Sequence, residues 1–272
     1  EIMLKNLLDE RKCFKLVCGA GNEDAQEVEK LVALYSKAGC KFFDLSAKPE
    51  IVEAAKRGLQ GREGYLCVSV GIKGDPHVRK AQINYEKCAG CHKCEEVCPQ
   101  RTIKHCKVKQ ARCIGCGKCY SVCSHGAISF VFENKDLNEV LPELVELGID
   151  CIELHAMDGD WVEKWDYINS VYDGMLSICT ARGRLSEEKM IEQIKQMITN
   201  RKPYSTIVQA DGYPMSGGSD DFKTTLQAVA TAEIVQNANL PVYIMLSGGT
   251  NSKTAELAKM CGINYNGIAI GT

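Results

Sequence analysis

The sequence predicts an α/β chain: a (β/α)₈ TIM-like barrel into which a short cysteine-rich unit is inserted. Eight short apolar runs alternate with amphipathic stretches, and one cysteine motif occurs twice between the third and fourth runs. Strict alternation of strand and helix indicates a parallel sheet, and eight units without a remainder favour a closed barrel over an open doubly wound sheet. The predicted strands cover residues 14–20, 41–46, 65–70, 151–156, 175–180, 206–210, 242–247 and 267–270.

Helices are predicted between these runs because apolar residues recur at helical spacing. The clearest stripes cover residues 28–35, 137–145, 190–197 and 254–261. Ser186 precedes Glu187 and Glu188, an arrangement typical of a helix N-cap with acids in the first turn. The helix that would follow the eighth strand is expected beyond Thr272.

The inserted unit contains the motif C-x₂-C-x₂-C-x₃-C twice, and each cysteine of the second copy lies 25 residues after its counterpart. This is the pattern of a bacterial-type ferredoxin with two [4Fe–4S] clusters, in which the fourth cysteine of each run binds the other cluster. Zinc is the alternative, but four-cysteine zinc sites usually consist of two separated C-x₂-C pairs. The predicted ligand sets are Cys88, Cys91, Cys94 and Cys123 for one cluster, and Cys113, Cys116, Cys119 and Cys98 for the other.

The position of the insertion predicts where the clusters lie. Residues 1–71 supply strands one to three, residues 72–134 form the inserted unit, and residues 135–272 supply strands four to eight. The insertion thus occupies a βα loop, and βα loops surround the mouth of a (β/α)₈ barrel, where chemistry takes place. We therefore expect the clusters over or beside the mouth.

Basic residues are concentrated in the inserted unit. Cations near an anionic cluster raise its reduction potential. A solvated basic surface and a docking patch for an acidic electron carrier are the alternatives. These residues are Lys80, Lys87, Lys93, Arg101, Lys104, Lys107, Lys109, Arg112 and Lys118.

Polar residues at the predicted strand ends supply the catalytic candidates Glu153, His155 and Asp211. Glu153 and His155 alternate with Ile152 and Leu154, so both are expected to point into the barrel. A glutamate and a histidine there would shuttle protons or orient a substrate. The alternative is that polar side chains at strand ends only satisfy one another.

A phosphate site is predicted where the seventh and eighth strands end, because these loops commonly bind phosphate through backbone N–H groups. Flavin mononucleotide or another phosphate-bearing ligand, such as a sugar phosphate, is the expected occupant, and two tight turns are the alternative. The segment 211–218 is expected to be a mobile loop that closes over a ligand. The phosphate-binding candidates are Ser247, Gly248, Gly249, Thr250, Gly271 and Thr272.

Composition bounds the remaining possibilities. The net charge of −2 over 272 residues gives no indication of nucleic-acid binding, and no apolar run approaches the roughly 18 residues of a membrane span. Sixteen cysteines without an export signal point to metal in a reducing, cytoplasmic compartment, although an organellar targeting segment before Glu1 stays open. The eight cysteines outside the motifs are expected to be buried small hydrophobes. A spare ligand is the alternative for Cys106, which lies inside the inserted unit, but it is not the expected role.

Six segments carry a family resemblance: residues 14–20, 75–80, 209–217, 224–225, 247–251 and 267–272. They resemble the light-dependent period protein (LdpA) family, the cyanobacterial iron–sulfur proteins of the circadian input pathway. The resemblance extends over nearly the whole chain and implies a redox-sensing iron–sulfur protein that binds protein partners, without implying a settled reaction.

Two functional hypotheses follow. In the first, the clusters relay or sense electrons and communicate with a redox partner protein or small electron carrier. In the second, the chain is an iron–sulfur oxidoreductase whose clusters feed electrons to a flavin or phosphate-bearing substrate in the barrel. A barrel fold alone does not choose between them.

Overall fold

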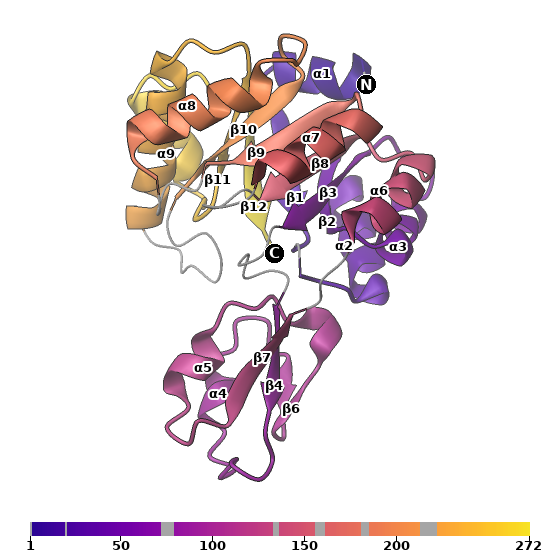
Figure 1. Ribbon diagram of the computed structural model, residues 1–272, viewed down its shortest axis with the longest axis vertical. Helices are drawn as coiled ribbons and strands as arrows, with labels where there is room; N and C mark the ends of the chain where they lie inside the picture. The colour runs from indigo at the N-terminus through magenta and orange to yellow at the C-terminus, as the bar shows by residue number, and fades with distance from the viewer. Residues whose placement is uncertain are drawn as a thin grey trace.

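A computed structural model describes residues 2–19, 21–71, 79–132, 136–155, 161–180, 185–212 and 222–272. Eight parallel strands close into a barrel in the order β1-β12-β11-β10-β9-β8-β3-β2 (Figure 1). This confirms the predicted barrel. The barrel strands are β1 (Cys13–Val17), β2 (Phe42–Ser46), β3 (Tyr65–Gly71), β8 (Cys151–His155), β9 (Met175–Cys179), β10 (Thr206–Asp211), β11 (Tyr243–Ser247) and β12 (Gly267–Gly271).

Each barrel strand coincides with a predicted run, although β1 ends earlier than expected. It stops at Val17, and Gly19 then adopts φ +102°, which turns the chain out of the sheet. Residues 20 and 156, the last of two predicted runs, lie outside the described residues.

Helices cover the outside of the barrel. Three of the four predicted stripes fall within helices, and the fourth runs one residue past the end of its helix, to Cys261. The predicted cap is present, because the Ser186 side chain accepts a hydrogen bond from the amide of Lys189. The helices of this part of the chain are α1 (Ile2–Asp9), α2 (Ala25–Lys37), α3 (Pro49–Leu59), α6 (Leu137–Glu146), α7 (Trp161–Val171), α8 (Glu187–Ile198), α9 (Phe222–Asn237) and α10 (Thr254–Met260).

Alternate residues of the strands point to opposite sides, as the period of two requires. Leu16, Ile152 and Leu154 pack outward into the apolar layer beneath the helices. The inward side changes character along the barrel axis: it is apolar where the strands begin and polar towards their carboxyl ends. The polar mouth is therefore at the end where the predicted candidates lie.

Helix α1, which the sequence analysis did not predict, covers the opposite end of the barrel. Its Leu4 and Leu8 are fully buried and pack with apolar residues at the strand starts, including Phe42 and Tyr243. Tyr243 also donates a hydrogen bond of 2.7 Å to Asp9. No helix among the described residues is both long and apolar enough to cross a membrane.

The chain leaves the barrel after β3 and returns at α6. The next barrel strand, β8, pairs directly with β3. It forms a smaller unit beside the end of the barrel where the C-terminus lies (Figure 1). Its elements are the antiparallel pair β4 (Arg79–Ile83) and β7 (Ile128–Phe132), the hairpin β5 (Ile103–Lys104) and β6 (Lys107–Val108), the short helices α4 (Lys93–Glu96) and α5 (Lys118–Val122), and a 3₁₀ turn at Gln110–Arg112.

The unit contacts the barrel through the segment that follows β1. Lys80, only 2% exposed, donates to the carbonyl oxygens of Gly21 and of Cys113, the latter at 2.9 Å. The amide of Glu23 donates to the carbonyl oxygen of Ala111 at 2.5 Å. Lys109 pairs with Asp24, and Arg112 lies 3.5 Å from Glu27. The second cysteine motif is thus the one that faces the barrel.

Candidate metal centre and barrel mouth

The cysteine-rich unit contains two cavities of nearly equal size. The first, of about 350 Å³, is lined by Cys98, Cys113, Cys116 and Cys119. The second, of about 370 Å³, is lined by another group of cysteines, comprising Cys88, Cys91, Cys94, Cys123 and Cys106. Each cavity therefore combines three cysteines of one motif with the fourth of the other, and the second cavity has an additional thiol.

The sequence repeat extends to the backbone conformation. Gly90 and Gly115, at equivalent positions 25 residues apart, have φ of +66° and +65°. His92 and Gly117, also 25 residues apart, are left-handed and immediately precede α4 and α5. These positive φ values wind the chain so that three closely spaced thiols face one centre.

Backbone amides approach the sulfur atoms in the manner that tunes iron–sulfur clusters. The amide of Thr102 donates to Cys98 Sγ at 3.4 Å, and that of Ala127 donates to Cys123 Sγ at 3.3 Å. These two contacts are again separated by 25 residues. A third amide, from Ala81, donates to Cys113 Sγ at 3.3 Å.

The electrostatics of the thiols fit a bound cation. Burial, together with the neighbouring Cys113 and Cys116, raises the pKa of Cys119 to about 11. In contrast, the amide of Ala127 lowers the pKa of Cys123. Several thiolates converging on a half-buried cavity repel one another, whereas a metal centre neutralises them. The cysteine thiols of both cavities suit iron–sulfur clusters or zinc, and His92 and His125 also line the second cavity.

An open hollow adjoins the first cavity, that of the Cys113 set, and shares Cys116, Gly117 and Phe130 with it. The exposed side chains of Tyr120 and Phe132 line this hollow, together with Lys118. The surrounding unit is strongly basic: residues 79–132 contain ten lysines and arginines but three acidic residues.

At the barrel mouth, Glu153 is the centre of a buried polar network. Lys15 Nζ lies 2.5 Å from Glu153 Oε2 and 3.6 Å from Asp44. His155 Nε2 lies 3.1 Å from Glu153 Oε1, and Ser177 donates to Oε2 at 2.9 Å. The structure thus brings together Glu153 and His155, as predicted, and adds a buried lysine.

The charges of this network are interdependent. Burial alone would raise the pKa of Glu153, but Lys15 and His155 outweigh it and hold this pKa well below its usual range. Burial also opposes the charge of Lys15, yet Asp44 and Glu153 together raise its pKa. Burial raises the pKa of Asp44. Lys15 is therefore a charged ammonium group paired with an ionised Glu153.

Asp211 lies in the same mouth. Burial raises its pKa to about 7, although the amide of Thr180 donates to it at 3.1 Å. Ser247, a predicted phosphate ligand, hydrogen-bonds to this carboxyl group. Asp211 therefore exchanges a proton near neutral pH, a property that suits acid–base chemistry. Its catalytic role, like that of Glu153 and His155, stays a prediction.

The predicted phosphate loop packs closely against the start of α9. The carbonyl oxygen of Gly248 accepts from the amide of Gly212, and that of Gly249 accepts from Thr224 and Thr225. A Cβ atom on Gly249 would lie 2.3 Å from Thr224. Close packing thus accounts for these glycines without a ligand.

The remaining phosphate candidates make similar structural contacts. Thr250 donates to Ala269, Gly271 pairs with Val17, and the amide of Thr272 donates to Val17 at 3.2 Å. A phosphate site here stays a prediction. Of the predicted mobile loop, residues 213–218 lie outside the described part of the chain.

Two residues that line these sites were not among the predicted site residues. Lys15 stands between apolar neighbours in β1, and a charged residue at an inward strand position is the signal that would have identified it. Cys106 lines a cavity, so the expectation that it is a buried small hydrophobe was wrong, as it was for the exposed Cys261. The other six cysteines outside the motifs are buried, as expected.

The fold and the cysteine cavities define a class: a TIM-like barrel that carries an iron–sulfur cluster-binding unit. Residues 88–133 match the LdpA Fe–S cluster-binding domain, and residues 143–271 match the Light dependent period A C-terminal domain. The chain is 31% identical over 253 residues to Light dependent period A of Synechococcus elongatus, covering 89% of this chain and 72% of that protein. The chain belongs to the LdpA family.

Solved structures of other barrels support the fold alone. The YdjI aldolase from Escherichia coli K12 superposes with a TM-score of 0.52 at 7% identity, covering 99% of this chain and 81% of the aldolase. A truncated 3-deoxy-D-arabino-heptulosonate 7-phosphate synthase from Thermotoga maritima gives 0.51 at 11% identity, covering 96% and 74%.

Proposed function

We propose that this chain binds two [4Fe–4S] clusters within residues 72–134 and relays or senses electrons at the barrel mouth. One observation carries the proposal: two cavities of similar size each combine three cysteines of one motif with the fourth of the other. This is the crossed ligation of two-cluster ferredoxins. Cys88, Cys91, Cys94 and Cys123 hold one cluster, and Cys113, Cys116, Cys119 and Cys98 hold the other.

Electrons would enter from a partner on one side of the cysteine-rich unit, and the other side of the unit contacts the barrel. The hollow beside Cys116 gives a partner access to the cluster of the Cys113 set, and the basic charge of the unit favours an acidic electron carrier. On the other side, Lys80 ties Cys113 to the segment after β1. The free state of all sixteen cysteines fits the cytoplasm or another reducing compartment.

Native mass spectrometry of protein purified without oxygen tests the cluster number. We expect the mass of two [4Fe–4S] clusters, with iron and sulfide in equal amounts. A zinc-containing protein, or one cluster per chain, would contradict the proposal.

The crossed pairing is tested in a variant that lacks Cys113, Cys116 and Cys119 and should therefore keep only the cluster of the Cys88 set. Adding Cys123→Ala should destabilise this remaining cluster, whereas adding Cys98→Ala, the matched control, should leave it unchanged. The opposite result would show that each fourth cysteine binds the cluster of its own motif.

Electron entry is tested by the rate at which a reduced acidic [2Fe–2S] ferredoxin reduces the clusters in stopped-flow measurements. The rate should fall steeply as salt increases, since screening weakens long-range attraction. Lys118→Glu, in the hollow, should slow it more than Lys104→Glu, on the β5–β6 hairpin. Equal effects of the two variants would argue against docking at the hollow.

The buried network around Glu153 favours a second candidate, an oxidoreductase that uses the clusters to reduce a flavin or phosphate-bearing substrate in the barrel. Glu153 and His155 are in contact, and Asp211 exchanges a proton near neutral pH. A bound organic mass in the same native spectrum would support this function. Its loss on replacing Gly248 by a bulky residue, with both clusters retained, would place the ligand at the mouth.

A further inference from the structure

We propose that Cys106 is an alternative iron ligand that exchanges with Cys88 at the cluster of the Cys88 set. This inference rests on the proposed function, and it concerns the cavity of the Cys88 set, which is lined by five cysteines. Cys106 lines this cavity together with the four predicted ligands, and its thiol hydrogen-bonds to that of Cys88.

The additional thiol breaks the internal repeat. The position 25 residues before Cys106 is Ala81, and the position 25 residues after it is Val131. The cavity of the Cys113 set, in its described lining, has four cysteines and none equivalent to Cys106. A cubane cluster needs four thiolates, so the cavity of the Cys88 set has one thiol more than its cluster needs.

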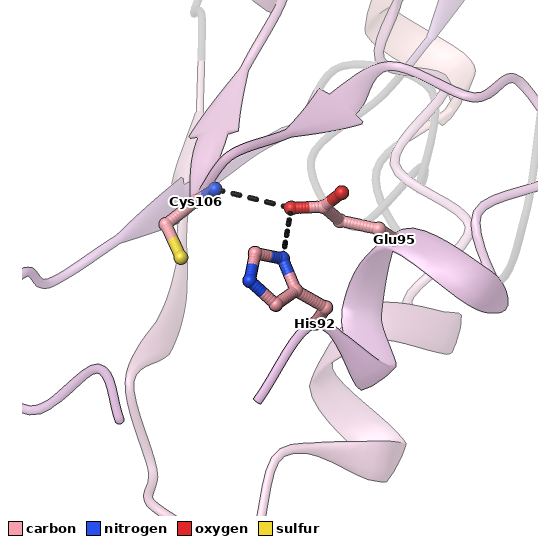
Figure 2. A group of neighbouring side chains, drawn as sticks. All are labelled: His92, Glu95 and Cys106. Carbon is pink, nitrogen blue, oxygen red and sulfur yellow. Dashed lines mark hydrogen bonds and ion pairs between the residues drawn. The ribbon is translucent and has the colours of Figure 1, made fainter. Parts of the chain in front are cut away.

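The chain holds Cys106 at this place through a specific turn. His105 and Cys106 form the two-residue turn between β5 and β6, and both are left-handed, with φ of +48° and +60°. Such turns usually contain asparagine or glycine, so a cysteine in this conformation is strained. Glu95 Oε1 accepts a hydrogen bond from the amide of Cys106 at 3.2 Å and lies 2.8 Å from His92 Nδ1. Figure 2 shows Glu95 between these two residues.

These contacts fix the turn to the ligand-bearing motif. Glu95 belongs to α4, the same short helix that carries Cys94, and His92 lies between Cys91 and Cys94. The turn that carries Cys106 is therefore held against the motif that supplies Cys88, Cys91 and Cys94.

The exchange needs no oxidant. Cys106 loses its thiol proton as its sulfur binds the iron corner, and Cys88 takes up a proton as its sulfur leaves. The cluster keeps its charge, its oxidation state and its four irons. The consequence is retention of the iron corner when Cys88 dissociates or is chemically modified.

The test compares alanine variants purified without oxygen, with iron and sulfide content and electron paramagnetic resonance as readouts. Cys88→Ala should keep the full iron content, because Cys106 replaces the lost ligand. Cys91→Ala, the matched control, should lose the iron of one cluster, which is half of the total. The double variant Cys88→Ala with Cys106→Ala should lose as much as Cys91→Ala.

A second measurement applies even if Cys88→Ala fails to fold. Cys106→Ala keeps all four predicted ligands, so it should contain both clusters but release iron faster than the wild type on exposure to air. Equal rates of release would overturn the proposal, as would equal iron loss in the Cys88→Ala and Cys91→Ala variants. A wild-type protein without two clusters would instead refute the proposed function.

One other arrangement of the same atoms is distinguishable. The ligand atoms of His92, Glu95 and Cys106 lie within 4.8 Å of one another and would accommodate a separate metal ion. A zinc ion in the wild-type protein that disappears in Cys106→Ala, with both clusters unaffected, would support that arrangement and overturn the ligand exchange.

Discussion

The barrel buries its strands between an inner layer and an outer, apolar layer, whereas the cysteine-rich unit has little to bury. Its apolar cluster is built around five buried residues, of which two are the predicted ligands Cys113 and Cys119. The charges differ as well: residues 79–132 contain ten basic and three acidic residues, and the rest of the chain contains 23 basic and 32 acidic residues. The barrel is therefore stabilised by apolar packing, and we expect the basic unit to depend on its metal.

Removal of iron should give the largest difference between the two regions. An anaerobic chelator together with an oxidant should abolish hydrogen-exchange protection between residues 88 and 123, because metal binding in such small units is part of their folding free energy. The barrel strands β1 to β3 should stay protected, since their apolar core does not include the clusters. Equal loss of protection in both regions would contradict the comparison.

Lys15→Met should destabilise the barrel by about 3–5 kcal/mol, because it leaves Glu153 and Asp44 buried without their counter-charge. Urea unfolding followed by circular dichroism measures this change, while the cluster absorbance at low urea should stay unchanged. Lys41→Met is the matched control: Lys41 and Glu63 are largely exposed, so its cost should be below about 1 kcal/mol. Similar values for both variants would show that the buried network is not strongly coupled.

Asp211 should make the stability of the barrel depend on pH. Its pKa is raised to about 7 in the folded chain, so the folded state keeps a proton that the unfolded chain releases near pH 4. Stability should therefore fall as pH rises from about 4 to about 7, by up to about 4 kcal/mol, and then level off. The lowered pKa of Glu153 contributes a stability that is lost as pH falls below about 5, so it opposes the effect of Asp211 near pH 4 and is constant at higher pH.

The comparison that isolates this carboxyl group is wild type against Asp211→Asn, by urea unfolding at pH 5 and pH 8. The asparagine variant should lose part of the decrease seen in the wild type. An identical decrease in the two proteins would show that Asp211 is ionised in the folded chain.

Lys80→Met should give the smallest effect, at the contact between the two regions. It removes the donor to the carbonyl oxygens of Gly21 and Cys113, at a cost of about 1–3 kcal/mol. Hydrogen exchange of the Glu23 amide should accelerate, and the reduction potential of the cluster of the Cys113 set should fall, because a nearby cation is lost. Lys109→Met, which removes a more exposed ion pair, should change both quantities less.

Sequence reasoning succeeded where the relevant information is local. Eight alternating runs were sufficient for the barrel strands, because inward and outward side chains repeat every two residues. The cysteine repeat was sufficient to name the candidate ligands, because the spacing within each motif brings its first three thiols to one cavity. Helix α1 was missed because it is short and its burial depends on strand starts far along the chain, including Tyr243.

The sequence by itself therefore determined the barrel, the insertion after its third strand and the two sets of cysteines, all of which follow from periodicity and short-range spacing. Only the tertiary structure decided that Lys15 meets Glu153, 138 residues away, and that Cys106 lies beside Cys88 in a cavity of five thiols. Such contacts depend on how separate elements pack, and burial then sets the charges of the groups that meet. No local pattern encodes either the distance or the desolvation.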